Sequence, residues 1–274
     1  MVKLSKALFL LLILNFYHIE TLKADDIKIQ AITSSFPPLQ MQKGDQSEGF
    51  TVNTIKTLVD VVNIANNSSI KIEFKFLPWK RALKVANSNS PNILFFAISR
   101  SPQRENKYQW IAPISQYDIH LFTLDKKLLE QQLTMKAIRE SEQIVGVQSG
   151  SSTEEYLLSL NFIKGSDYLT YTDYREGIRM LYRKRLDYIP MTSFLARGNV
   201  CNENLNPEKL FKGIRLNEIS NPLWAVFSKK TSKKLVQQFS TLLNQINRDI
   251  DYQAGVNKEI KIWTDMVCFD EVNS

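Results

Sequence analysis

Apolar residues in the first third of the chain follow two different periods. Residues 26–35 and 70–76 alternate between apolar and polar side chains, which predicts strands. Residues 51–67 carry valine, isoleucine and leucine at helical spacing, and residues 79–87 follow a proline that suits the first turn of a helix. Residues 92–99 are nearly all apolar, as is typical of a strand buried in a parallel sheet. The order strand, helix, strand, helix, strand predicts a doubly wound α/β unit.

The pattern repeats later in the chain. Strands are predicted at residues 143–148 and 186–191, and helices at residues 153–160 and 174–185. The second helix follows an aspartate with a glutamate three residues later, the spacing of a capping box. An amphipathic segment at residues 233–251 then begins the last part of the chain. The sequence therefore predicts a second α/β unit.

No linker rich in proline, glycine or serine separates the two units, and the predicted joints are extended segments near 116–122 and 220–227. Two lobes joined by two crossings form a clam-shell, in which a ligand lies at the carboxyl ends of the strands. We predict an α/β fold of two lobes, each a doubly wound sheet. Lobe 1 spans residues 25–118 and returns at 228–274, and lobe 2 spans 119–227.

The first 24 residues do not fit either lobe. Lys3 and Lys6 precede an apolar run that is too short to span a bilayer comfortably, and Ala24 supplies a small residue for cleavage. We predict a secretory signal peptide at residues 1–24 and a periplasmic or secreted protein. A retained N-terminal anchor is the alternative.

Composition narrows the functional classes. The chain has 274 residues, a formal net charge of +7 and 43% hydrophobic residues. Its lysines are scattered among acids without a long basic run, so we expect no nucleic-acid partner. The two histidines are His18 and His120, and the first would leave with the signal peptide; with no C-x-x-C motif, we expect no metal site. We also expect no cofactor. We expect a monomer.

Export makes the cysteine pair informative. Cys201 and Cys268 are the two cysteines of the chain, and an oxidising compartment permits a disulfide between them. Two separately buried thiols are the alternative.

The end of the strand at 92–99 carries the strongest candidate chemistry. Ser99, Arg100 and Arg104 follow directly on the apolar run. Such a cluster is either a solvated charged turn or a binding site for a carboxylate at the mouth of a cleft.

Four segments resemble the family 3 extracytoplasmic solute-binding proteins, the polar amino-acid-binding type of ABC importers. They are "FPPLQMQKGDQSEGFTVN", "LPWKRAL", "ISRSPQRENKYQWIAP" and "VGVQSGSSTEEYL", in the order and spacing of the family. The segments "RLDYIPM" and "YQAGVNKEIKIW" also fit. The resemblance implies the two-lobed type II periplasmic-binding fold, which agrees with the pattern above.

The resemblance also implies ligand-binding residues. Arg104 matches the arginine that clamps the ligand's carboxylate, a task suited to a planar guanidinium with parallel N–H groups. Ser99 and Ser152 match hydroxyl residues that help to hold the ligand. Phe36 and Trp79 match apolar contacts to it, although each would also fit an ordinary core.

One half of the family's site is altered in this chain. The aspartate that pairs with the ligand's ammonium is replaced by Thr192, and a Ser/Thr contact to the ammonium by Ala97. Threonine cannot neutralise a charge in a closed cleft. Either a neighbouring acid compensates, with Glu48, Asp173 and Asp118 as candidates, or the ligand is no ordinary α-amino acid.

Together these features predict an exported, non-enzymatic solute-binding protein that captures a small carboxylate-bearing ligand by hinge closure, with an ABC permease as the implied partner. One alternative is an enzyme on the same fold that resembles cyclohexadienyl dehydratases and needs an acidic side chain in the cleft. Another is an orphan sensory binding module.

Overall fold

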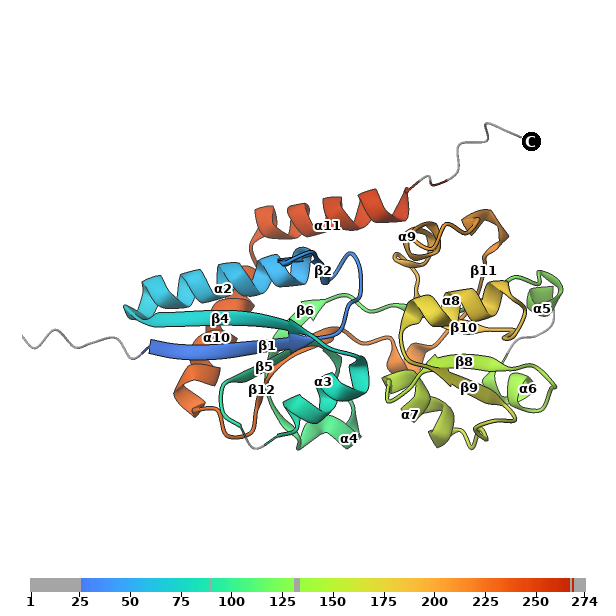
Figure 1. Cartoon of the computed structure of the whole chain (residues 1–274), viewed down its shortest axis with the longest axis horizontal. Helices are drawn as coiled ribbons and strands as arrows, with labels where there is room; N and C mark the ends of the chain where they lie inside the picture. The colour runs from blue at the N-terminus through green and yellow to red at the C-terminus, as the bar shows by residue number, and fades with distance from the viewer. Residues whose placement is uncertain (1–25, 89, 131–133, 267, 269–274) are drawn as a thin grey trace, which may run out of the picture.

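The computed structural model describes residues 26–88, 90–130, 134–266 and 268, arranged in two lobes side by side (Figure 1). The predicted two-lobed α/β fold is confirmed. The predicted signal peptide lies outside the described residues.

Lobe 1 is built on a five-stranded sheet. Its strand order is β4 (Ser69–Phe76), β1 (Asp26–Thr33), β5 (Ile93–Ser99), β12 (Leu223–Ser228) and β6 (Tyr108–Ser115). Strands β4, β1 and β5 are parallel, and β12 runs antiparallel to both of its neighbours. The apolar run of β5 is buried over its whole length, in agreement with its place as the central strand of the sheet.

Helices cover both faces of this sheet. Ile29 and Ala31 of β1 share a core with α2 (Phe50–Asn66) and α10 (Lys233–Ile246). Ile32 points to the other face, where α3 (Trp79–Ala86) packs. This alternation follows from the period of two along a strand.

Strand β12 corrects the predicted lobe boundary. Residues up to 227 were expected in lobe 2, but Leu223–Ser228 is hydrogen-bonded between β5 and β6 in the lobe 1 sheet. The chain therefore returns to lobe 1 about five residues earlier than predicted, because the apolar side chains of β12 complete the lobe 1 core.

Lobe 2 has a smaller and more divided sheet. Strand β7 (Ile119–Thr123) lies between β10 (Ile189–Thr192) and β11 (Phe211–Arg215), antiparallel to both. Strands β8 (Val145–Gln148) and β9 (Tyr168–Tyr171) form a parallel pair. A hydrogen bond of 2.8 Å from the Gly146 amide to the Tyr188 carbonyl joins this pair to the chain entering β10.

The helices next to this sheet are α7 (Ser152–Ser159) and α8 (Tyr174–Tyr182). The remaining short elements are β2 (Met41–Lys43), β3 (Gln46–Glu48), α4 (Pro102–Glu105), α5 (Lys127–Glu130), α6 (Met135–Arg139), η1 (Pro207–Lys209) and η2 (Asn217–Ile219). No helix in the described ranges is both long enough and apolar enough to cross a membrane.

The C-terminal part of the chain reaches lobe 2. The predicted segment 233–251 is divided, since α10 ends at Ile246 and α11 (Ile250–Thr264) begins after Asp249, whose side chain caps it. Helix α11 extends toward α9 (Ala196–Cys201) of lobe 2 (Figure 1). There the Trp263 indole donates a hydrogen bond of 3.2 Å to the Leu195 carbonyl.

The two cysteines meet at the same place. Cys201, the last residue of α9, forms a disulfide with Cys268 beyond α11. Helix α11 and Cys268, which follow the predicted return to lobe 1, thus contact lobe 2 as well.

Candidate functional site: a pocket between the lobes

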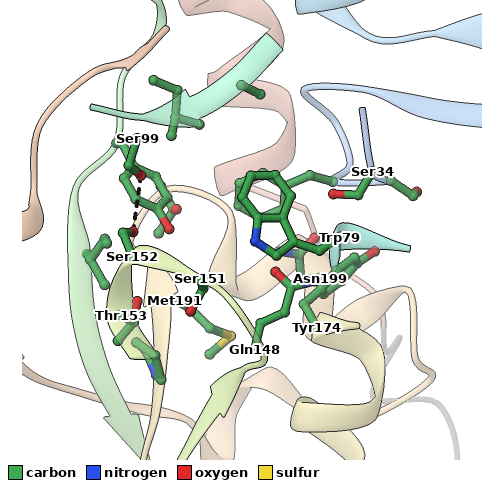
Figure 2. A pocket seen from close by; sticks show the side chains of 18 of the residues that line it. Ser34, Trp79, Ser99, Gln148, Ser151, Ser152, Thr153, Tyr174, Met191 and Asn199 are labelled. Atoms are coloured by element: carbon green, nitrogen blue, oxygen red, sulfur yellow. Dashed lines mark hydrogen bonds between the residues drawn. The ribbon is translucent and has the colours of Figure 1, made fainter. Parts of the chain in front are cut away.

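A pocket opens where the strands of lobe 1 face α7, β10 and α9 of lobe 2. Six of the seven predicted ligand-binding residues line it, namely Phe36, Trp79, Ser99, Arg104, Ser152 and Thr192. Figure 2 shows Ser99 and Ser152 on one side, and Trp79, Gln148, Asn199 and Tyr174 gathered on another. The pocket therefore draws on residues that are distant in sequence, and its shape depends on how the lobes meet.

Aromatic side chains form much of the wall. Tyr117, between β6 and β7, and Tyr171 and Tyr174 of lobe 2 line the pocket together with Phe36 and Trp79 of lobe 1. Burial raises the pKa of Tyr171 and of Tyr174, so both hydroxyls stay neutral at physiological pH. The wall thus suits a small organic molecule with an apolar body.

Arg104 is the charged residue at the centre of the lobe contact. It lies in the short helix α4 just after β5, and its side chain is 3% exposed. Its Nη2 is 2.9 Å and its Nε 3.2 Å from Oε1 of Glu155, which belongs to α7 of lobe 2. A buried guanidinium needs such a counter-ion, because an unpaired charge in this position is costly.

Two carbonyls complete the surroundings of the guanidinium. Arg104 donates to the Gly150 carbonyl at 3.1 Å and to the Ser99 carbonyl at 3.3 Å. With the two bonds to Glu155, these contacts use four of the five N–H donors of an arginine. At most one donor is left for a bound carboxylate while this arrangement lasts.

Further hydrogen bonds join the lobes beside Arg104. The Trp79 indole donates to the Gly150 carbonyl at 2.8 Å, and the hydroxyls of Ser99 and Ser152 are 3.1 Å apart (Figure 2). We call Arg104, Ser99 and Ser152 the Arg104 region of the pocket.

Ser152 lies at the first position of α7 and is not its cap. The capping residue is Ser151, whose hydroxyl accepts a hydrogen bond of 3.1 Å from the Glu154 amide. The Ser152 hydroxyl is thereby free to face Ser99 across the lobe contact.

Arg100 lies outside the pocket lining. Its guanidinium bonds both carboxylate oxygens of Glu105, at 2.8 and 2.5 Å, and stacks over the rings of Trp110 and Trp224. This arrangement matches the charged-turn interpretation. The two arginines of one motif thus have different surroundings.

The acids considered as substitutes for the missing aspartate lie outside the pocket lining. Asp173 caps α8, Asp118 bonds Ser193 and Arg215, and Glu48 lies on β3. No aspartate or glutamate is present among the described residues that line the pocket.

Asn199 is a pocket residue that sequence analysis missed. It lies on α9, is 2% exposed, and its side-chain Oδ1 has no hydrogen-bond partner among the described residues. The same holds for Oγ1 of Thr192, which is 3% exposed. We call Thr192 and Asn199 the β10–α9 region. No signal in the sequence marks Asn199 as a pocket residue. Buried asparagines are uncommon, but burial cannot be read from a sequence.

The described residues hold no group of three or more His, Cys, Asp or Glu side chains placed to bind a metal ion. The described residues at the pocket offer hydrogen bonding, aromatic contacts and the ion pair of Arg104 with the partly exposed Glu155.

Two lobes around a pocket of this kind are the architecture expected of a solute-binding protein. Residues 29–261 match the family model of the bacterial extracellular solute-binding proteins, family 3, and the chain belongs to that family. No relative was found among curated protein sequences.

Solved structures share the fold at low sequence identity. An amino acid ABC transporter substrate-binding protein from Streptococcus pneumoniae bound to L-arginine is 16% identical, with a TM-score of 0.69 over 87% of this chain and 97% of that one. An ancestral arginine-binding protein bound to glutamine is 17% identical, with a TM-score of 0.65 over 86% and 96%. A histidine kinase sensor domain is 16% identical, with a TM-score of 0.68 over 86% and 96%.

Proposed function

We propose that the protein is an exported solute-binding protein that captures a small carboxylate-bearing molecule in the interlobe pocket. The observation that carries the proposal is that Arg104, buried in the pocket wall, already holds a carboxylate, that of Glu155. Its Nε and Nη2 groups are therefore presented in a form that suits a carboxylate.

Binding then requires an exchange of carboxylates. The Glu155 side chain is 30% exposed and lines a neighbouring groove with Ser101, to which it is also hydrogen-bonded. It has room to rotate toward water, while the ligand's carboxylate takes its place on Arg104. Contacts from both lobes to the ligand favour the closed form, and no bond is made or broken.

Delivery to a membrane permease is the proposed purpose of capture, supported by the ABC transporter protein among the structural neighbours. A sensory role is the second candidate, because a histidine kinase sensor domain shares the fold to the same extent. The enzymatic alternative needs an acidic side chain at the ligand, and the described lining supplies none.

The test is a thermal-shift screen of small carboxylic acids against the wild type and Arg104→Ala. A ligand at 100 times its Kd stabilises the protein by about 2.7 kcal/mol. We expect the acids that stabilise the wild type to lose nearly all of this effect in Arg104→Ala, because the carboxylate loses its counter-ion. Arg104→Lys, which keeps a point charge without the fork, should bind with intermediate affinity.

Arg100→Ala is the matched control, since it removes an arginine of the same motif that lies outside the pocket lining. It should keep the full stabilisation. Stabilisation that survives unchanged in Arg104→Ala contradicts the proposal.

A further inference from the structure

Two buried polar atoms in the pocket find no hydrogen-bond partner in the part of the chain that the structure describes, although buried polar atoms normally have one. Oγ1 of Thr192 and Oδ1 of Asn199 are both in this state, in side chains more than nine-tenths buried. Leaving such a group unsatisfied in the folded protein is unfavourable. Because both residues line the pocket, a bound molecule can supply the missing hydrogen bonds.

The segment that carries these atoms is held firmly. Next to Thr192, the backbone amide of Ser193 donates a hydrogen bond of 2.8 Å to the Asp118 carbonyl. The Ser193 hydroxyl donates another, of 2.6 Å, to the Asp118 carboxylate. The backbone N–H of Asn199 donates a hydrogen bond of 2.9 Å to the Leu195 carbonyl. A side chain at Gly198 would collide with the Trp263 indole. The two atoms are therefore presented in a fixed arrangement, as in a preorganised binding site.

The charge of this region limits what it can bind. Thr192 and Asn199 are neutral, the tyrosines of the wall are neutral, and no acid is present in the described lining. A ligand ammonium enclosed here would find hydrogen-bond acceptors but no counter-charge, which is costly in a closed pocket. A hydroxyl or an amide N–H would gain the same hydrogen bonds without that cost.

We propose that Thr192 and Asn199 bind an uncharged hydrogen-bond donor of the ligand. The ligand is then a carboxylic acid whose second polar group is a hydroxyl or an amide and not a free ammonium. The amide Oδ1 accepts and the threonine Oγ1 donates or accepts, so a hydroxyl suits the pair better than a ketone, which has no proton to give. This inference rests on the proposed capture of a carboxylate by Arg104.

The experiment compares acids that differ in one group. L-phenylalanine, 3-phenyllactate and phenylpyruvate form one set, and L-leucine, 2-hydroxy-4-methylpentanoate and 4-methyl-2-oxopentanoate form another. Isothermal titration calorimetry gives the Kd of each for the purified protein. We expect each hydroxy acid to bind at least about tenfold more tightly than its amino acid, with the oxo acid between them.

Variants then test the residues. Thr192→Asp and Asn199→Asp each place a carboxylate in this region and should reverse the preference, so that the amino acid binds better than the hydroxy acid. Asn202→Asp adds the same charge at an exposed position three residues after Asn199 and should leave the preference as in the wild type.

The possible failures are distinguishable. Amino acids that bind the wild type as tightly as their hydroxy acids, with both lost in Arg104→Ala, overturn the neutral-donor inference and leave carboxylate capture intact. If no member of either set binds, and no other carboxylate stabilises the protein, carboxylate capture fails and the inference fails with it. A preference unchanged in both aspartate variants overturns the assignment to Thr192 and Asn199.

Discussion

Arg104 and Asn199 are both almost fully buried in the wall of one pocket, yet their polar groups differ in whether they have hydrogen-bond partners. Hydrogen bonds to Glu155, Gly150 and Ser99 occupy most of the N–H groups of Arg104. Oδ1 of Asn199 has no partner among the described residues. The polar groups of the Arg104 region thus find partners within the protein, whereas Oδ1 of Asn199 in the β10–α9 region does not find one among the described residues.

The two regions are therefore expected to have different roles, one in holding the lobes together and the other in selecting the ligand. Contacts of the Arg104 region run between the lobes, so they hold the two lobes together in the arrangement described. Under the proposal above, Oγ1 of Thr192 and Oδ1 of Asn199 gain hydrogen-bond partners from the ligand, so this region would discriminate between ligands. We therefore expect variants near Arg104 to alter closure and overall affinity, and variants near Asn199 to alter selectivity.

The largest expected effect comes from removing the disulfide, which anchors α9 two residues beyond Asn199. Cys201→Ser with Cys268→Ser should lower the free energy of unfolding by about 2–4 kcal/mol, measured by urea denaturation. It should also reduce the preference for hydroxy acids over amino acids, because α9 is then held less firmly. The dependence of binding on Arg104 should not change.

Wild-type protein treated with a thiol reductant should behave like the double variant, and the double variant should not respond to the reductant. Unaltered selectivity in the double variant would show that the disulfide does not position Asn199.

Glu155→Gln addresses the other region. It removes the counter-ion of a buried arginine, so the free energy of unfolding should fall by about 1–2 kcal/mol, a value reduced because Glu155 is partly exposed. The same change removes the carboxylate that competes with the ligand. Carboxylic acids should therefore bind more tightly to the less stable variant, as measured by calorimetry and thermal shift.

Glu105→Gln is the matched control, because it breaks the Arg100–Glu105 pair of the same motif outside the pocket lining. It should leave ligand affinity as it is. Weaker carboxylate binding in Glu155→Gln would mean that Glu155 supports the ligand and does not compete with it.

The elements that local patterns define were predictable from the sequence. Val52, Ile55, Leu58, Val59 and Val62 have helical spacing, and all five are buried on one face of α2. The apolar run at 93–99 is the central strand β5. In both cases the period of the element and the side that is buried are properties of a few neighbouring residues.

Features that depend on distant partners were not predictable. Strand β12 is apolar enough for either lobe, and only its pairing with β5 and β6 assigns it to lobe 1. A glutamate on a helix is usually solvated, and the partner of Glu155 lies 51 residues earlier in the chain. Asn199 differs from an exposed asparagine only in its burial, which the fold of the whole lobe determines.

The smallest expected effect concerns His120. It lies on β7 opposite Met191 of β10, one position from the pair that Thr192 forms. Burial, with Lys212 and Arg215 nearby, lowers the pKa of His120, against the opposing effect of Asp118. The unfolded chain therefore takes up a proton before the folded one. Stability is intact above the ordinary histidine pKa of about 6.5 and decreases as the pH falls below it.

Thermal unfolding between about pH 7.5 and about pH 5.5 should show this loss in the wild type and a smaller one in His120→Gln. Selectivity for hydroxy acids should weaken only at a lower pH than that at which the stability loss begins, where His120 of the folded protein takes up its proton and disturbs the strand pair that holds Thr192. The ion pair of Arg104 with Glu155 lies in the other region, so closure itself should change little. An equal loss in wild type and variant would place the titrating group elsewhere and remove His120 from the support of the β10–α9 region.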